Sequence, residues 1–112
     1  MKPLATTFRS HGYDFVQLDR VGNVALFEKA RPDVSRPSYE VVIVQQHGER
    51  VIAGNTIAAA EAMPGAEQWG RLGWTCPTLD HALVKFGEQL KKQGPVPPAR
   101  PVTLADLAEM EA

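Results

Sequence analysis

The sequence predicts an α+β fold: an antiparallel sheet of three to four strands, in β-meander order, with a short helix and one long amphipathic helix packed on one face. Runs of β-branched and aromatic residues, separated by turn residues, fill the first half of the chain and favour strands. From Leu79 onward, apolar residues recur at the helical period. With 112 residues, of which 44% are hydrophobic, the chain is long enough to bury one modest core.

Three strands are expected in the first part of the chain. Residues 13–20 and 24–29 are rich in strand-favouring types, and the Gly-Asn pair between them supplies the positive φ that a tight hairpin needs. A polar loop with two prolines then leads to residues 39–46. Because residues 41–44 are all β-branched, we expect this third strand to be central and covered on both faces.

The segment between the third strand and the long helix is ambiguous. A turn is predicted at residues 47–50 and a strand at residues 52–59, although the alanines of residues 55–63 also favour helix. Residues 63–70 are expected to form a turn that leads into a short helix of about two turns. Residues 73–76 are too few for a helix and are expected to form a brief extended segment.

A long helix is predicted to begin after Thr78, because the threonine hydroxyl can accept a hydrogen bond from a free backbone N–H of the first turn. An acidic residue in the first turn and two lysines in the last turn suit the helix dipole, and Gly94-Pro95 ends the helix. The apolar residues that form one stripe at helical spacing are Leu79, Ala82, Leu83, Phe86 and Leu90.

The composition changes abruptly after Gln93, and this change defines the domain organisation. We expect a flexible N-terminal lead-in at residues 1–12, a single α+β domain at residues 13–93, a proline-rich spacer at residues 94–102 and a short acidic C-terminal helix at residues 103–112. Such a short helix is marginal alone, so it must dock either on its own domain or in trans, on a second copy or a partner.

Charge and composition argue against several classes of function. A net charge of −1 and a pI near 6.3 give no overall basic field of the kind on which duplex-DNA binders rely. The sequence contains no membrane-spanning run and no signal-peptide core. Its single cysteine, Cys76, cannot form an internal disulfide. A cytoplasmic location without a membrane partner is therefore expected.

The sequence carries no recognisable catalytic signature. His11, His47 and His81 lie far apart, without partners at metal-ligand spacing, so neither a metal nor another cofactor is expected. Cys76 is expected to be a buried, inert thiol, and no phosphate-binding loop or nucleophile elbow is present. We therefore expect that the protein is not an enzyme.

Three motifs precede or begin the long helix, and together they resemble the core of a known group of proteins. They are the strand Tyr39-Glu40-Val41, the turn Pro64-x-x-Glu67-x-Trp69-Gly70 and the segment Gly73-Trp74-Thr75. The pattern is similar to that of small, mostly uncharacterised proteins carried by phages, prophages and plasmids, over about residues 13–92. The resemblance implies an accessory protein of a mobile genetic element that binds a host or plasmid component, a class that includes inhibitors of host defence systems.

Two functional hypotheses follow, together with an open question about oligomeric state. The first is a non-enzymatic protein-interaction protein whose partner is a host, plasmid or phage protein, with candidate partner-binding residues Leu104, Asp106, Leu107, Met110, Trp69 and Arg71. The alternative is a module that binds single-stranded nucleic acid on the sheet face, with candidate residues Arg20, Arg31, Arg36 and Trp74. A sheet with an unprotected edge also leaves a homodimer open.

Overall fold

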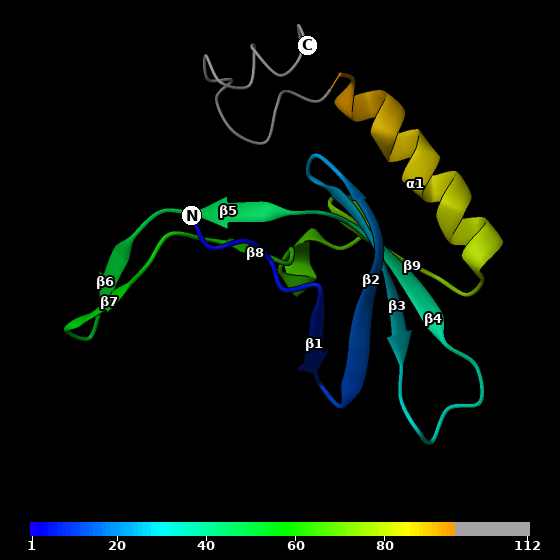
Figure 1. The fold of residues 1–112 in the computed structure, drawn as a ribbon, viewed down its shortest axis with the longest axis horizontal. Coiled ribbons are helices and arrows are strands. Elements are labelled where there is room, and N and C mark those ends of the chain that lie inside the picture. The colour runs from blue at the N-terminus through cyan, green and yellow to red at the C-terminus, as the bar shows by residue number, and fades with distance from the viewer. Residues whose placement is uncertain (96–112) are drawn as a thin grey trace, which may run out of the picture.

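The computed structural model describes residues 1–95 of the chain, and its architecture is α+β (Figure 1), as predicted. Within these residues there are three antiparallel sheets, one α-helix and one short 3-10 helix. In chain order the elements are β1 (Thr7–Ser10), β2 (Tyr13–Val21), β3 (Val24–Ala30), β4 (Ser38–Ile43), β5 (Gln45–His47), β6 (Arg50–Ile52), β7 (Asn55–Ile57), β8 (Ala60–Ala62), η1 (Ala66–Gln68), β9 (Gly73–Cys76) and α1 (Leu79–Gln93).

The main sheet of the described chain has five strands in the order β1-β2-β3-β4-β9, all antiparallel. Strands β2, β3 and β4 confirm the three predicted strands, and Gly22 adopts the positive φ expected of the β2–β3 turn. The third strand ends at Ile43 and not at residue 46, because residues 45–47 pair with β8 in a separate sheet. The sheet exceeds the predicted three to four strands at both edges. One added strand is β1, and the other is β9, which is the brief extended segment predicted at residues 73–76.

Alternation along β3 and β4 gives the sheet an apolar layer on each face. Val24 and Leu26 of β3 pack with Val41 of β4 toward α1, on what we call the helix face. Phe27 and Val42 point the other way, into a second cluster on what we call the cleft face. All five of these side chains are almost fully buried. The prediction of a strand covered on both faces is therefore confirmed for β4.

Helix α1 lies across β3, β4 and β9 on the helix face. Its N-terminus is capped as predicted, because the Thr78 hydroxyl accepts a hydrogen bond from the backbone N–H of His81 at 3.2 Å. At the other end the Gln93 amide bonds the β2–β3 turn, donating to the carbonyl of Val21 and accepting from the N–H of Asn23. Of the residues described, none forms a helix long and apolar enough to cross a membrane.

The segment between β4 and β9 corrects two predictions. No turn forms at residues 47–50, because the chain stays extended from β5 into β6. The predicted strand at residues 52–59 is also wrong, since the chain reverses inside it at Ala53-Gly54, where φ is 51° and 78°. Two consecutive positive φ values are what a two-residue hairpin turn requires. Strands β5 to β8 thus form one two-stranded arm, residues 45–62, which projects from the sheet (Figure 1).

Two further predictions need correction, and one lies outside the described residues. The short helix expected at residues 63–70 is only the single turn η1, because Trp69 is extended and Gly70 has a φ of 89°. The lead-in at residues 1–12 contains the edge strand β1, because Phe8 has an apolar partner in Phe15 of β2. The predicted spacer and C-terminal helix lie outside the described residues, apart from Gly94 and Pro95.

Candidate functional site

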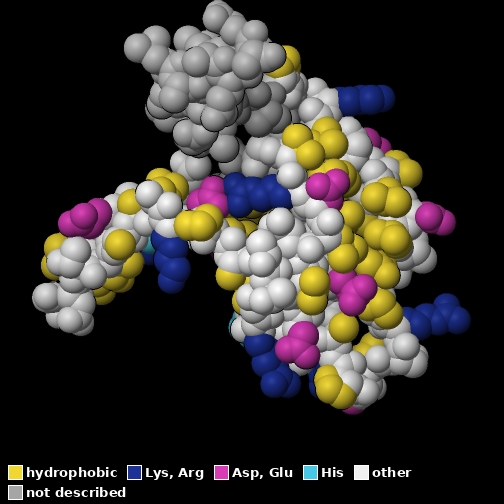
Figure 2. All heavy atoms as spheres, in the orientation of Figure 1, with side chains coloured by type: hydrophobic (Ala, Val, Ile, Leu, Met, Phe, Trp, Pro, Cys, Tyr) yellow, Lys and Arg dark blue, Asp and Glu magenta, His cyan; other side chains and the backbone are white. Residues whose placement is uncertain are grey.

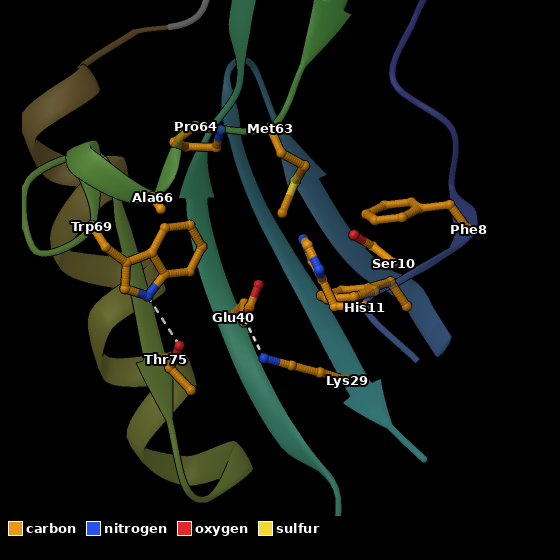
Figure 3. Close-up of a pocket in the computed structure, with 11 residues that line it drawn as sticks. Phe8, Ser10, His11, Lys29, Glu40, Met63, Pro64, Ala66, Trp69 and Thr75 are labelled. Carbon is orange, nitrogen blue, oxygen red and sulfur yellow. Dashed lines mark hydrogen bonds and ion pairs between the residues drawn. The ribbon is translucent and has the colours of Figure 1, made fainter. Parts of the chain in front are cut away.

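A cleft of about 360 Å³ opens on the cleft face of the main sheet (Figure 3). Its floor consists of side chains from the sheet, and its walls come from β1 and from the chain that follows β8. This volume is near the lower end of the range found for small-molecule and side-chain sites. The residues that line the cleft are Phe8, Ser10, His11, Phe15, Lys29, Glu40, Met63, Pro64, Ala66, Trp69 and Thr75.

Strand register explains why the floor residues share one face. Phe15 of β2 lies opposite Lys29 of β3, and Glu40 of β4 lies opposite Thr75 of β9. Directly opposed residues of antiparallel strands point to the same side of the sheet. Phe8 stacks on Phe15, with ring centroids 4.8 Å apart and an interplanar angle of 8°, so the wall from β1 is aromatic.

Trp69 forms the opposite aromatic wall and is fixed by two contacts. Its Nε1 donates a hydrogen bond of 3.0 Å to Oγ1 of Thr75, as the dashed line in Figure 3 shows. Its ring also lies against the backbone of Gly73. A Cβ added at Gly73 would lie only 2.5 Å from Cζ3 of the indole. The glycine that begins β9 is therefore what allows Trp69 to reach the sheet.

A buried ion pair lies on the cleft floor. The Glu40 side chain is only 6% exposed, and its Oε1 accepts a hydrogen bond of 3.2 Å from Nζ of Lys29. The ammonium also lies 4.4 Å from the ring centroid of Tyr13, so the lysine is held by a carboxylate and an aromatic face together. A buried carboxylate requires such a partner because of the cost of removing it from water. Among the described residues, no hydrogen bond reaches the second oxygen of Glu40.

Polar side chains of the cleft form two contacts with one another. Glu40 accepts a hydrogen bond from Lys29, and Thr75 accepts one from Trp69, as the dashed lines in Figure 3 show. Cys76 is also on β9, but it packs on the helix face, and burial raises the pKa of its thiol. A raised thiol pKa keeps the sulfur protonated and unreactive. Within residues 1–95, no group of three or more metal-ligating side chains comes together.

The candidate partner-binding residues fall into two groups. Trp69 forms the cleft wall, and Arg71 is exposed in the turn that follows it, so the structure places these two close in the fold. Leu104, Asp106, Leu107 and Met110 lie outside the described residues.

Sequence reasoning did not single out the floor pair, Lys29 and Glu40. A signal for Glu40 was present, since it is an acid within a strand predicted to be covered on both faces, where a carboxylate needs a partner. Which cation would pair with it depends on strand register.

The candidate nucleic-acid-binding residues are not brought together. Arg20 points to the cleft face and is paired with Glu61 of β8, whereas Trp74 packs on the helix face beneath Lys85 of α1. Arg31 forms a two-pronged pair with Asp33.

Arg36 is exposed in the loop between β3 and β4. Two of the three arginines are thus already engaged with carboxylates of the same chain. The two tryptophans pack against opposite faces of the sheet.

The Arg20–Glu61 pair fixes the base of the arm to the main sheet. Nη1 and Nη2 of Arg20 donate to the two oxygens of Glu61 at 2.7 and 2.6 Å, and the backbone N–H of Leu4 donates to the same carboxylate at 2.9 Å. These bonds lower the pKa of Glu61 to about 2, chiefly through the side-chain hydrogen bonds from Arg20. The carboxylate is therefore a junction between β2, β8 and the N-terminal segment.

Comparisons of the chain with protein-family models, with curated proteins and with solved structures find no match. The resemblance to accessory proteins of mobile genetic elements therefore stays a prediction.

Proposed function

We propose that the chain is a non-enzymatic protein-interaction protein, and that its cleft accepts one aromatic side chain from an extended segment of a partner protein. The observation that carries this proposal is the cleft itself, which has an aromatic wall on each side and a floor whose polar groups are bonded to one another. Such a site offers apolar contact area together with a few polar groups that fix the orientation of what binds.

The lining favours an aromatic residue that carries a hydrogen-bond donor. Phe8 and Trp69 can contact the faces or edges of an entering ring, and ring pairs of this kind stabilise contacts beyond their buried area. Glu40 can accept a bond from an N–H or O–H at the end of that ring through its second oxygen. Tryptophan and tyrosine combine a large apolar surface with such a donor. We therefore expect a partner segment with Trp or Tyr as its anchor.

The position of the cleft favours an extended segment. It adjoins β1, which is an edge strand of the main sheet. The outer edge of such a strand presents backbone N–H and C=O groups to an added strand. In this mode of recognition the backbone bonds supply affinity, and a pocket for an alternate side chain supplies specificity. Ser10 and His11 at the end of β1 line the cleft, so a strand added there would bring its side chains to the opening.

The biological setting of the proposal rests on the sequence resemblance alone. That resemblance favours a partner from a host, a plasmid or a phage, including components of host defence systems. The C-terminal residues Leu104, Leu107 and Met110 belong to the same proposal as a second contact with that partner. Deletion of residues 95–112 would then weaken partner binding while the unfolding midpoint of the folded domain stays unchanged. Equal affinity of the truncated chain would remove the tail from the proposal.

A random-peptide display library selected on the immobilised protein tests the cleft. We expect enriched peptides with a Trp or Tyr anchor, whose affinity for the wild-type protein is then measured by fluorescence anisotropy. The variant Ser10→Phe should fill the cleft and weaken binding by at least about tenfold. Arg9→Phe is the matched control, because Arg9 is the neighbouring residue of β1, is 67% exposed at its side chain and points to the other face. Equal affinity of the Ser10→Phe variant, or no enriched sequence, would contradict the proposal.

The same instrument separates this function from the nucleic-acid alternative. A labelled single-stranded oligonucleotide is titrated at low and at moderate salt. Binding through phosphate contacts weakens steeply as salt rises, whereas the peptide contact proposed above depends mainly on apolar burial. Oligonucleotide binding that falls with salt and is lost in Arg36→Gln would favour the alternative instead.

A further inference from the structure

Helix α1 leaves an apolar strip of the sheet uncovered. The helix packs on β3, β4 and β9, so the helix-face side chains of β2 lie beside it and not beneath it. Five side chains that are between 38% and 49% exposed border this strip, and Figure 2 shows hydrophobic side chains gathered over α1 and the neighbouring strands. We call these five exposed side chains the β2–α1 patch: Val16, Leu18 and Val21 from β2, with Leu79 and Leu83 from α1.

The β2 contribution to the patch depends on a bulge. Register shifts between Gln17 and Asp19, so Leu18 and Asp19 together lie opposite Leu26, which belongs to the helix-face cluster. The bulge therefore adds one more apolar side chain to that face. On α1, Leu79 and Leu83 lie on the flank of the buried stripe. An exposed apolar group of this kind, in a small chain, is typical of a contact surface.

The outer half of the arm carries a second set of exposed aliphatic side chains. Strands β6 and β7 pair only with each other within the described chain, and all six of their residues are exposed. Their register places Ile52, Ile57 and Arg50 on one side of this ribbon and Val51 with Thr56 on the other. An isolated two-stranded ribbon is marginally stable in water. Packing against another surface would stabilise it.

The charges of the two surfaces are complementary. Acidic side chains border the β2–α1 patch: Glu28 lies opposite Val16, Asp19 follows Leu18, and Asp80 lies in the first turn of α1. Figure 2 likewise shows acidic side chains interspersed with the hydrophobic ones on this face. The side of the arm that presents Ile52 and Ile57 carries Arg50 instead. An apolar contact bordered by opposite charges favours this pairing over contact between two patches of the same kind.

The two surfaces cannot meet within one chain, because the arm projects from the sheet on the side away from α1 (Figure 1). We propose that the arm of one copy docks on the β2–α1 patch of a second copy, and that the second copy returns the same contact in a two-fold symmetric exchange. In a closed exchange of this kind, the arm and the patch of each copy are all buried. No arm or patch is then left free to bind a third copy and extend a filament. The cleft, on the other face of the sheet, stays open in this dimer.

Neighbouring residues that face different ways supply matched variants. Ile52→Asp alters the docking side of the arm, and Val51→Asp alters its other side one residue away. Leu83→Asp alters the patch, and Val84→Asp places the same charge about 100° further round α1, where the side chain is 63% exposed. Ile52→Asp and Leu83→Asp should each raise the dimer dissociation constant by at least about tenfold, measured by light scattering during size exclusion. The Val51 and Val84 variants should stay dimeric.

A mixing experiment distinguishes the exchange from its alternatives. A mixed pair of Ile52→Asp and Leu83→Asp chains keeps one intact contact, because the arm of the second chain meets the unaltered patch of the first. Equimolar mixing should therefore restore dimer that neither variant forms alone. If the dimer formed by contact between the two arms, only Ile52→Asp would abolish it. If it formed by contact between the two β2–α1 patches, only Leu83→Asp would abolish it.

Cross-linking gives a readout that does not depend on altered affinity. A chain with Ile52→Cys and a chain with Leu83→Cys should form a disulfide-linked pair under mild oxidation, and Val51→Cys with Val84→Cys should not. The native Cys76 is buried and does not interfere. A wild-type protein that is monomeric at tens of micromolar, or cross-linking that does not distinguish the two pairs, would overturn the proposal. Anchor-peptide binding should be unchanged in the Asp variants, since the cleft lies on the other face.

Discussion

Protonation of Glu61 should release the arm from the main sheet and lower the stability of the fold. Its pKa falls from 4.5 to about 2 because Arg20 and the backbone N–H of Leu4 hydrogen-bond the carboxylate. A group whose folded-state pKa is lowered contributes stability that is fully present above its unfolded pKa. That contribution is lost as the pH falls from about 4.5 toward 2. The ion pair therefore stabilises the native state at neutral pH and ceases to do so in acid.

The size of this effect follows from the same pKa. Each tenfold change in proton affinity corresponds to about 1.4 kcal/mol, so the difference between 4.5 and about 2 sets an upper limit of about 3.5 kcal/mol. The side chains of Arg20 and Glu61 are 20% and 13% exposed, so solvent reduces the interaction somewhat. We expect Glu61→Gln to lower the free energy of unfolding at neutral pH by about 2 kcal/mol, partly because Arg20 is left half-buried without its carboxylate.

Urea denaturation of the wild type and of Glu61→Gln, followed by circular dichroism between about pH 6 and pH 1.5, measures the prediction. The difference in free energy of unfolding between the two proteins should shrink toward zero in acid, because the protonated wild type has also lost the ion pair. Asp33→Asn is the control: its pair with Arg31 is also two-pronged, but the Asp33 side chain is 63% exposed, so its loss should change stability far less than the loss of the Glu61 carboxylate. A difference that stays constant with pH would refute the assignment of the pKa shift to this contact.

Three other changes follow from the same structure. Gly73→Ala should destabilise the fold by about 2 kcal/mol in thermal unfolding and change the fluorescence of Trp69, because the new Cβ would collide with the indole ring. Gly87→Ala is the control, since a Cβ there meets nothing within 4 Å, and it should be neutral or stabilising by up to about 1 kcal/mol. Thr78→Ala should cost about 1 kcal/mol in the same measurement, because the N-cap bond of α1 is lost. The Cys76 thiol should react with a disulfide reagent far more slowly in the native protein than in urea, and fast native labelling would contradict its burial.

Local sequence signals predicted the sheet core and the long helix because each of these elements is specified by its own residues. The β-branched run of β4 required cover on both faces, and Thr78 with the apolar stripe fixed the start and period of α1. The arm could not be predicted in the same way. Its turn uses Ala53 at a positive φ, which is uncommon for alanine, and its strands have no buried face to impose alternation.

The candidate site was only partly predictable because it depends on pairing between distant strands. The Pro-to-Trp motif singled out Trp69, which forms one wall of the cleft. Phe8 could not be found, because it lies in a segment without a clear pattern and is ordered by Phe15 across the β1–β2 pair. Lys29 and Glu40 become partners only once β3 and β4 are in register. Long-range register is information that periodicity within one strand does not contain.

The arm and the cleft have a common structural origin in the connection between β4 and β9. These strands are hydrogen-bonded neighbours in the sheet, yet residues 44–72 separate them in the chain. The first part of that connection leaves the sheet as the arm, and its last part returns across the cleft face and delivers Trp69 to Thr75. Glu61, between the two parts, is tied to Arg20 of β2. Because the Arg20–Glu61 pair fixes the point from which the arm and the cleft diverge, its loss should disturb dimer formation and peptide binding together. The Asp variants of the arm and patch should disturb dimer formation alone.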